Sequence, residues 1–211
     1  MNQHDLKTGD LLFFDNEGCG CMSLCSCLIK KCTRSNITHI AMVVKDPDFL
    51  DPPPKGSGPL QGLYVWESNW EGTPDPQDGK IKLGVQITPL QEICESYMNS
   101  NSPMYVRRIN CDPSYFSTPI LREIHKVVHN KMYDIIPMDW IKAIVREDAK
   151  PQKTDRFWCS ALVGYIYTEC SILPSYTDWS ILRPSDFAKD YLELLGGVTL
   201  DKMKPFIYTK I

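Results

Sequence analysis

The sequence lacks a long apolar run, a block of like charge and an apolar leader. No stretch reaches the roughly 20 apolar residues that span a bilayer, and the first seven residues contain no apolar segment typical of a secretory signal. The 23 basic and 26 acidic residues are scattered, so no basic face indicates a nucleic-acid partner. We therefore expect a protein that is neither secreted nor transmembrane and binds no nucleic acid, while peripheral contact with a membrane stays open.

Cysteine pairs with the C-x2-C spacing are also missing. Nine cysteines are an odd number, and in a chain without a secretory signal they indicate reduced thiols and a cytoplasmic location. Five of them are clustered: Cys19, Cys21, Cys25, Cys27 and Cys32. Their spacing differs from that of C-x2-C zinc knuckles, so we expect small apolar side chains there, with structural zinc and reversible acylation as the alternatives. We expect no bound metal and no cofactor.

Histidine is scarce, which narrows the search for a catalytic base. The chain has four: His4 near its start, His39 at the head of a predicted strand, and His125 and His129 within one predicted helix. The last two are four residues apart, as zinc ligands can be, but the segment lacks a His-Glu-x-x-His arrangement, and we expect no metal there. His39 is the best placed base, because the strand that follows it would hold the imidazole rigidly.

The pattern of the chain changes from strands to helices. Short apolar or alternating segments predict strands at 11–14, 37–44, 62–67, 85–87 and 104–109, and helical spacing predicts helices at 89–97, 119–130, 139–146, 156–170 and 184–195, with a further edge strand near 206–208. Residues 47–59 contain five prolines and two glycines, which predicts an irregular surface loop. Strands followed by helices favour a single α+β domain over residues 1–211, in which an antiparallel sheet packs against helices.

Cys159 is the candidate nucleophile. It lies in Phe157-Trp158-Cys159-Ser160-Ala161, at the predicted start of an apolar helix, where unpaired N–H groups and the helix dipole favour a thiolate. A thiolate there can attack a carbonyl carbon, and its own N–H can help to hold the oxyanion. Considered alone, a free cysteine is more often a small buried residue.

Strand pairing supplies a candidate carboxylate for His39. If 37–44 and 62–67 pair as antiparallel neighbours with His39 opposite Glu67, alternation puts both polar side chains on one otherwise apolar face. Ala41 would then face Val65. A carboxylate beside the imidazole would fix its tautomer and stabilise the imidazolium. The alternative for Glu67 is a solvated carboxylate at a strand end.

Six short motifs occur in an order that resembles a known family: Gly9-Asp10-Leu11-Leu12-Phe13, Thr38-His39-Ile40-Ala41, Val65-Trp66-Glu67-Ser68, Gly84-Val85-Gln86-Ile87-Thr88-Pro89-Leu90, Met132-Tyr133-Asp134 and Trp158-Cys159-Ser160-Ala161-Leu162-Val163. Over most of its length the chain resembles the circularly permuted NlpC-type papain-like proteins, particularly the YaeF/YiiX-like amidases and their poxviral relatives. The resemblance implies a circularly permuted papain-like fold in which Cys159, His39 and Glu67 form a triad. It also implies that Tyr133 contributes to the oxyanion or substrate site. The Pro-rich loop and the cysteine cluster depart from the family pattern.

These observations predict a cysteine hydrolase, amidase-like or peptidase-like, or an acyltransferase that forms a thioester on Cys159. The substrate would be a peptide, another amide or a lipid acyl group, and the resemblance does not choose among them. Trp66, Trp70 and Trp158, expected to be exposed, would suit an apolar acceptor or acyl chain, although aromatics beside such a cleft are more often packing residues. The alternative is a catalytically inactive protein of the same fold that binds a partner.

Overall fold

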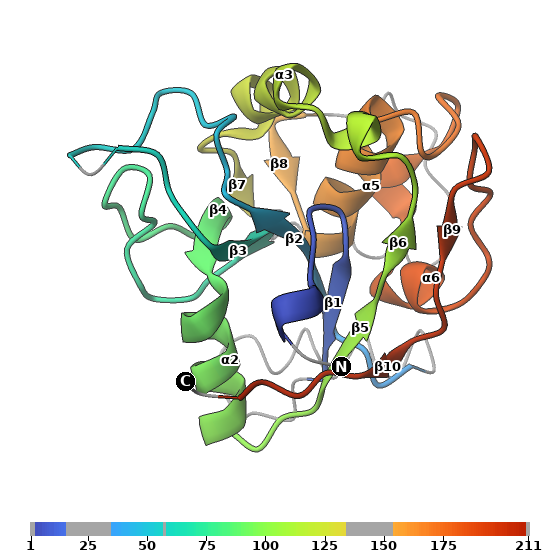
Figure 1. Ribbon diagram of the computed structural model, residues 1–211, viewed down its shortest axis with the longest axis horizontal. Coiled ribbons are helices and arrows are strands. Elements are labelled where there is room, and N and C mark those ends of the chain that lie inside the picture. Colours follow the sequence, from blue (N-terminus) through green and yellow to red (C-terminus); the bar gives the residue numbers. More distant parts are fainter. Residues whose placement is uncertain (1–2, 16–34, 57, 134–153, 210–211) are drawn as a thin grey trace.

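The computed structural model describes residues 3–15, 35–56, 58–133 and 154–209. Within these ranges the chain has an α+β architecture built on a curled eight-stranded sheet, with helices on both of its faces (Figure 1). The strand order is β10-β5-β1-β2-β3-β4-β7-β8, so the first three strands of the chain lie side by side at the centre. A short two-stranded sheet, β6 with β9, lies beside it.

The main sheet contains β1 (Leu11–Phe14), β2 (His39–Lys45), β3 (Leu63–Asn69), β4 (Gly84–Pro89), β5 (Met104–Arg107), β7 (Met132–Tyr133), β8 (Arg156–Phe157) and β10 (Lys204–Pro205), and the small sheet contains β6 (Ile109–Asn110) and β9 (Thr199–Leu200). The α-helices are α2 (Leu90–Asn99), α3 (Thr118–Val128), α5 (Cys159–Glu169) and α6 (Pro184–Ala188). Three 3-10 helices complete the elements: η1 (Gln3–Asp5), η2 (Pro113–Phe116) and η3 (Trp179–Ile181).

Most of the predicted segments form the expected element within three residues at their ends, but three expectations need correction. Short strands also occur in the second half, and β7 pairs with β8 in parallel, so the sheet is not purely antiparallel. The tail pairs with β5 at Lys204–Pro205 and not at 206–208. The last helix ends at Ala188, because the backbone becomes extended at Lys189, and Arg107 donates to the carbonyls of Phe187 and Lys189 there. The predicted helix 139–146 and the cysteine cluster lie outside the described residues.

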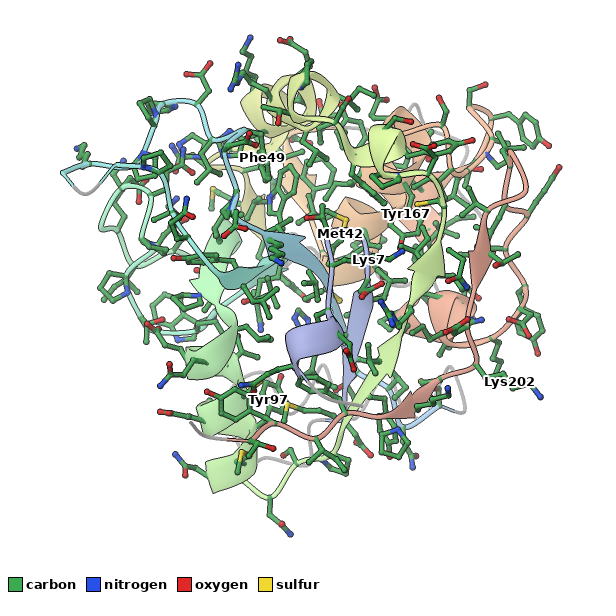
Figure 2. All side chains as sticks on the ribbon, in the orientation of Figure 1. Lys7, Met42, Phe49, Tyr97, Tyr167 and Lys202 are labelled. Carbon is green, nitrogen blue, oxygen red and sulfur yellow. The ribbon has the colours of Figure 1, made fainter. Side chains whose placement is uncertain are left out.

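The β-strand alternation divides the core into two layers, one on each face of the sheet. On one face Phe13 and Met42 join a large cluster that α3 and α5 cover. On the other face Phe14 and Val43 join a smaller cluster that α2 covers through residues such as Tyr97 (Figure 2). Fully burying a large apolar side chain stabilises a fold by about 1.5–3 kcal/mol, so both layers contribute substantially to stability.

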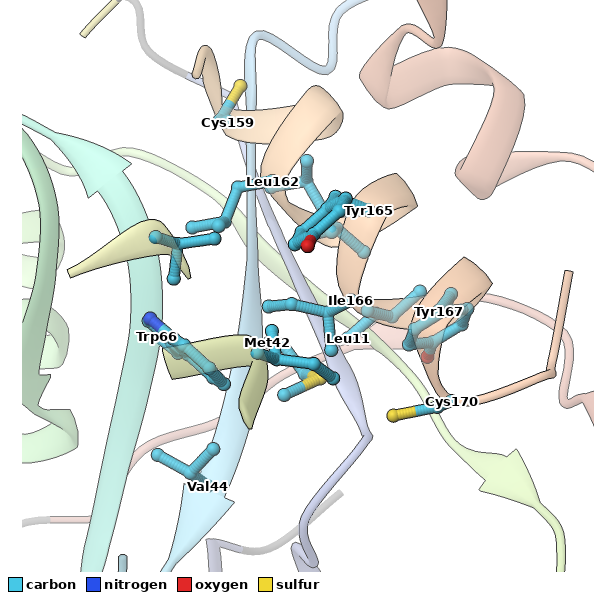
Figure 3. Close-up of a cluster of buried hydrophobic side chains, with 14 of the residues drawn as sticks. Leu11, Met42, Val44, Trp66, Cys159, Leu162, Tyr165, Ile166, Tyr167 and Cys170 are labelled. Atoms are coloured by element: carbon cyan, nitrogen blue, oxygen red, sulfur yellow. The ribbon is translucent and has the colours of Figure 1, made fainter. Parts of the chain in front are cut away.

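Helix α5 is apolar around its whole circumference, which is why it is buried. Figure 3 shows Leu162 and Ile166 directed toward Met42, whereas Cys159 lies at the start of the helix with its sulfur pointing away from these three side chains. At Gly164 an added Cβ would lie 2.8 Å from Leu182 Cδ1 and 3.0 Å from Trp179 Cβ, so glycine favours this close approach of α5 to the η3 segment. The apolar packing therefore fixes the helix that carries Cys159.

The Pro-rich loop forms no helix or strand in its described residues, as predicted, but it is firmly attached to the core. Its Asp51 N–H donates to His125 Nδ1 at 3.3 Å, and the Nε2 of the same ring lies 3.0 Å from Gln77 Oε1. Gln77 Nε2 in turn donates to the Pro52 carbonyl at 2.7 Å. Because Nδ1 accepts a hydrogen bond, the proton of a neutral His125 lies on Nε2, and the ring joins two loops only in this neutral form.

This arrangement predicts an acid-sensitive contribution to stability. Burial, with the neighbouring His129 charge, lowers the pKa of His125 to about 3. Below its ordinary pKa of 6.5 the unfolded chain binds a proton that the folded protein does not, so stability is present above pH 6.5 and is lost as the pH falls. We expect His125→Gln to reduce the pH slope of the unfolding free energy by up to about 1.4 kcal/mol per pH unit. Urea unfolding between about pH 7 and pH 4 measures this slope, and an unchanged slope would contradict the assignment.

Candidate active site

The topology brings four strand ends together at one end of the sheet. Because β1, β2, β3 and β4 are consecutive antiparallel neighbours, the end of β1, the start of β2, the end of β3 and the start of β4 coincide. His39 is the first residue of β2 and Asn69 is the last residue of β3. At Gly84, which starts β4 with φ of 150°, an added Cβ would lie 2.2 Å from the Lys131 carbonyl oxygen. Glycine thus allows the β7 segment, which leads toward β8 and α5, to approach this end.

The register of β2 with β3 differs from the expected one by two residues. Val43 faces Val65 and Met42 faces Trp66, so continued pairing sets Glu67 opposite Ala41 and not opposite His39. A shift of two residues leaves the side-chain parity unchanged, so His39 and Glu67 still lie on the same face. The two side chains are diagonal neighbours across the strand pair, and long polar side chains can span the distance between such positions.

The residues on either side of Cys159 are fixed by hydrogen bonds to other parts of the chain. Ser68 Oγ, on β3, donates to the Phe157 carbonyl at 2.6 Å. Trp158 Nε1 and Ser160 Oγ both donate to the Leu182 carbonyl, at 3.3 Å and 2.7 Å. Cys159 is the first residue of α5, and the side chain of its N-cap residue, Trp158, makes no capping hydrogen bond to the first turn. The start of this helix is therefore fixed to the sheet on one side and to the η3 segment on the other.

The structure brings Cys159, His39 and Glu67 together. His39 Nε2 lies 2.8 Å from Glu67 Oε2, and the imidazole is also adjacent to the Cys159 thiol. Since Nε2 faces the carboxylate, Nδ1 is the ring nitrogen left for the sulfur. The three residues are almost completely buried, with exposed fractions of 4% for Cys159, 5% for His39 and 0% for Glu67.

The surroundings of His39 favour its charged form. Burial lowers the pKa of the imidazole, but the adjacent Cys159 and Glu67 raise it by more, and the net effect is a pKa of about 10. Burial has the opposite consequence for the thiols of Cys94 and Cys170, whose pKa is raised to about 12. Among the cysteines in the described ranges, Cys159 is the one with an imidazole as its neighbour.

Two further polar residues, Thr88 and Asn69, contact this group, and Asn69 links it to a third, Glu71. Thr88 Oγ1, on β4, donates to Glu67 Oε1 at 2.9 Å. Asn69 Nδ2 donates to Glu67 Oε2 at 3.4 Å and to Glu71 Oε1 at 2.5 Å. The signal available in the sequence was the spacing of Glu67, Asn69 and Glu71 at i, i+2 and i+4, which continues one face of a strand.

The aromatic candidates are divided among different environments. Tyr133 is 6% exposed and pairs with Phe157, two residues before Cys159, so it lies near the site, and its role stays a prediction. Trp158 is partly buried beside Cys159. Trp70 is 52% exposed. Trp66 was expected to be exposed, but it is 1% exposed, because its position on β3 faces the large core cluster, where it packs on Phe49.

The remaining expectations concern metals, membranes and relatives. Among the described residues no group of three or more His, Cys, Asp or Glu side chains is arranged to hold a metal ion. No helix in these ranges is both long and apolar enough to cross a bilayer. A comparison with models of protein families finds no match to this chain, and a comparison with curated proteins finds no match either.

Proposed function

We propose that this protein is a thiol-dependent hydrolase or acyltransferase that uses Cys159, His39 and Glu67 as nucleophile, base and orienting residue. One observation carries the proposal: an imidazole lies between a thiol at a helix start and a buried carboxylate. This is the arrangement that nucleophilic catalysis by cysteine requires. The resemblance to circularly permuted papain-like amidases, drawn from the sequence motifs, agrees with it, and that fold is part of the proposal.

The proposed reaction has two steps. His39 accepts the thiol proton, and the Cys159 thiolate attacks the carbonyl carbon of an amide, ester or thioester. The N–H groups at the start of α5 would hold the oxyanion, and the imidazolium gives its proton to the leaving group as the bond to the acyl carbon breaks. His39 then takes a proton from water, or from an acceptor alcohol or amine, which attacks the thioester and releases the acyl product with regeneration of the thiol.

Selective alkylation tests the nucleophile directly. The charged imidazole of His39 favours the reactive form of a thiol beside it, so iodoacetamide at about pH 6 should modify Cys159 first. Cys94 and Cys170 should react slowly, because burial raises the pKa of each to about 12. Peptide mass spectrometry identifies the modified residue, and His39→Ala should slow the reaction at Cys159.

The control variant for this experiment is Cys94→Ala, which removes a buried thiol of α2 and should leave the labelling of Cys159 unchanged. The proposal would be wrong if the label were spread over the cysteines between Cys19 and Cys32, spared Cys159 and did not respond to His39→Ala. In that case Cys159 would be a structural thiol.

A further inference from the structure

The carboxyl group of Glu71 is linked to the candidate triad by the Asn69 amide. Asn69 Nδ2 lies 2.5 Å from Glu71 Oε1 and 3.4 Å from Glu67 Oε2. An amide NH₂ carries two hydrogens, so a single Asn side chain can donate to both carboxyl groups at once. His39 Nε2 is 3.5 Å from the same Asn69 nitrogen, which puts the amide beside the His39–Glu67 contact.

The buried carboxylate of Glu67 needs these donors. Glu67 is 0% exposed, and its oxygens are contacted by Thr88 Oγ1, His39 Nε2 and Asn69 Nδ2. A buried carboxylate is stable only when its oxygens accept hydrogen bonds or face a cation. Asn69 therefore helps to fix the Glu67 rotamer that faces His39, and Glu71 in turn restrains Asn69.

We propose that Asn69 and Glu71 are positioning residues of the site, and that ionisation of Glu71, transmitted by charge and by the Asn69 amide, strengthens the charged form of His39. This inference rests on the proposed function, because it assigns roles toward the same triad. Neither residue touches the reacting atoms. Each acts through the His39–Glu67 pair.

The electrostatic surroundings of Glu71 come from three elements. Burial and the Glu67 charge raise the pKa of Glu71 to about 8, Glu92 on α2 acts in the same direction, and His39 on β2 and the Asn69 amide oppose them. Glu71 is thus a neutral acid in acidic solution and an anion in alkaline solution. Because the coupling between two sites is reciprocal, the Glu71 anion raises the pKa of His39.

This leads to a test by Glu71→Gln that depends on pH. Glutamine resembles the protonated acid, so native protein and variant should behave alike at about pH 6. Above about pH 8 the native protein gains a charge that the variant lacks, so the His39 pKa should be lower in the variant by about half a unit to one unit. NMR titration of ¹⁵N-histidine-labelled protein measures it, with the His39 signal assigned from His39→Ala.

The matched control is Glu123→Gln, which removes an exposed carboxylate of α3 that pairs with Lys126. It should leave the His39 titration unchanged. A variant that merely loosened the fold would differ from native protein at every pH, whereas the proposed role predicts a difference confined to alkaline solution. An identical His39 titration in native protein and Glu71→Gln would overturn the inference.

Asn69→Ala supplies the second arm of the test. It should lower kcat about 10-fold with little change in KM, because an amide that only positions Glu67 does not bind substrate. In the Asn69→Ala background, Glu71→Gln should have a smaller effect on kcat than it has alone, a non-additivity that a double-mutant cycle measures. Additive effects would remove the role of Asn69 as the link. The NMR arm needs no turnover, so it distinguishes failure of this inference from failure of the proposed activity.

Discussion

Replacing Cys159 by alanine should reduce turnover of any acyl substrate to the background rate, a loss of about 10,000-fold or more, because no other group replaces the nucleophile of a covalent mechanism. The side chain is small and 4% exposed, so alanine leaves a cavity of only one sulfur atom, and we expect the fold to be retained. A panel of p-nitrophenyl esters of short and long acyl chains, together with peptide amides, provides the first substrates.

The same variant tests the thioester directly. Native protein mixed with a reactive ester and quenched in acid should gain the mass of one acyl group on Cys159, and the variant should gain none. Cys170→Ala is the matched control, because it removes a buried cysteine near the other end of α5 and should leave acylation unchanged. Turnover that survives in Cys159→Ala would refute the mechanism. Absence of acylation in native protein across the whole panel would favour the alternative of an inactive binding protein.

The sequence predicted which side chains share a face better than it predicted which residues pair. Alternation put His39 and Glu67 on one face, and this survives the two-residue difference in register because the side-chain period of a strand is two. The exact register depends on the loop that joins β2 to β3. That loop is fixed by His125 and Gln77, which come from distant parts of the chain. Local pattern cannot reveal contacts of this kind.

The polar residues around the triad show a second limit of sequence reasoning. Thr88 reaches Glu67 because β4 pairs with β3 so that Val65 faces Thr88 and Glu67 faces Gln86. The local pattern predicts a strand at 85–87 but does not reveal which strand it pairs with. Trp66 follows the same alternation: its neighbour Glu67 faces the site, so Trp66 faces the opposite layer, where it is buried in the large core cluster.

The sequence predicts where α5 starts but does not predict the contacts that hold this start in place. An apolar run that begins at Cys159 indicates a buried helix, and the structure begins α5 at that residue. The contacts that hold it, from Ser68 to the Phe157 carbonyl and from Ser160 to the Leu182 carbonyl, join residues 89 and 22 positions apart. Such contacts follow from tertiary packing and have no signature in local spacing.

His39→Ala should have the second largest effect, because it removes both the base and the only cation in contact with Glu67 among the described residues. General acid–base catalysis contributes about 100- to 10,000-fold, so kcat should fall within that range or below it. Glu67→Gln should cost less, about 10- to 100-fold, since an amide oxygen can still accept from His39 Nε2 while the amide NH₂ faces Thr88. Stopped-flow acylation rates separate the two variants.

The two variants should also differ in stability. His39→Ala leaves Glu67 as a buried carboxylate without its cation, and breaking a buried pair in this way costs about 3–5 kcal/mol. In native protein the pKa of His39 is about 10 compared with an ordinary value of 6.5, so its contribution to stability is full below pH 6.5 and is lost as the pH rises toward 10. Urea unfolding from about pH 6 to pH 10 should therefore show the difference between native protein and His39→Ala shrinking with rising pH. A difference that is constant or grows over this range would mean that His39 is not charged in the folded protein.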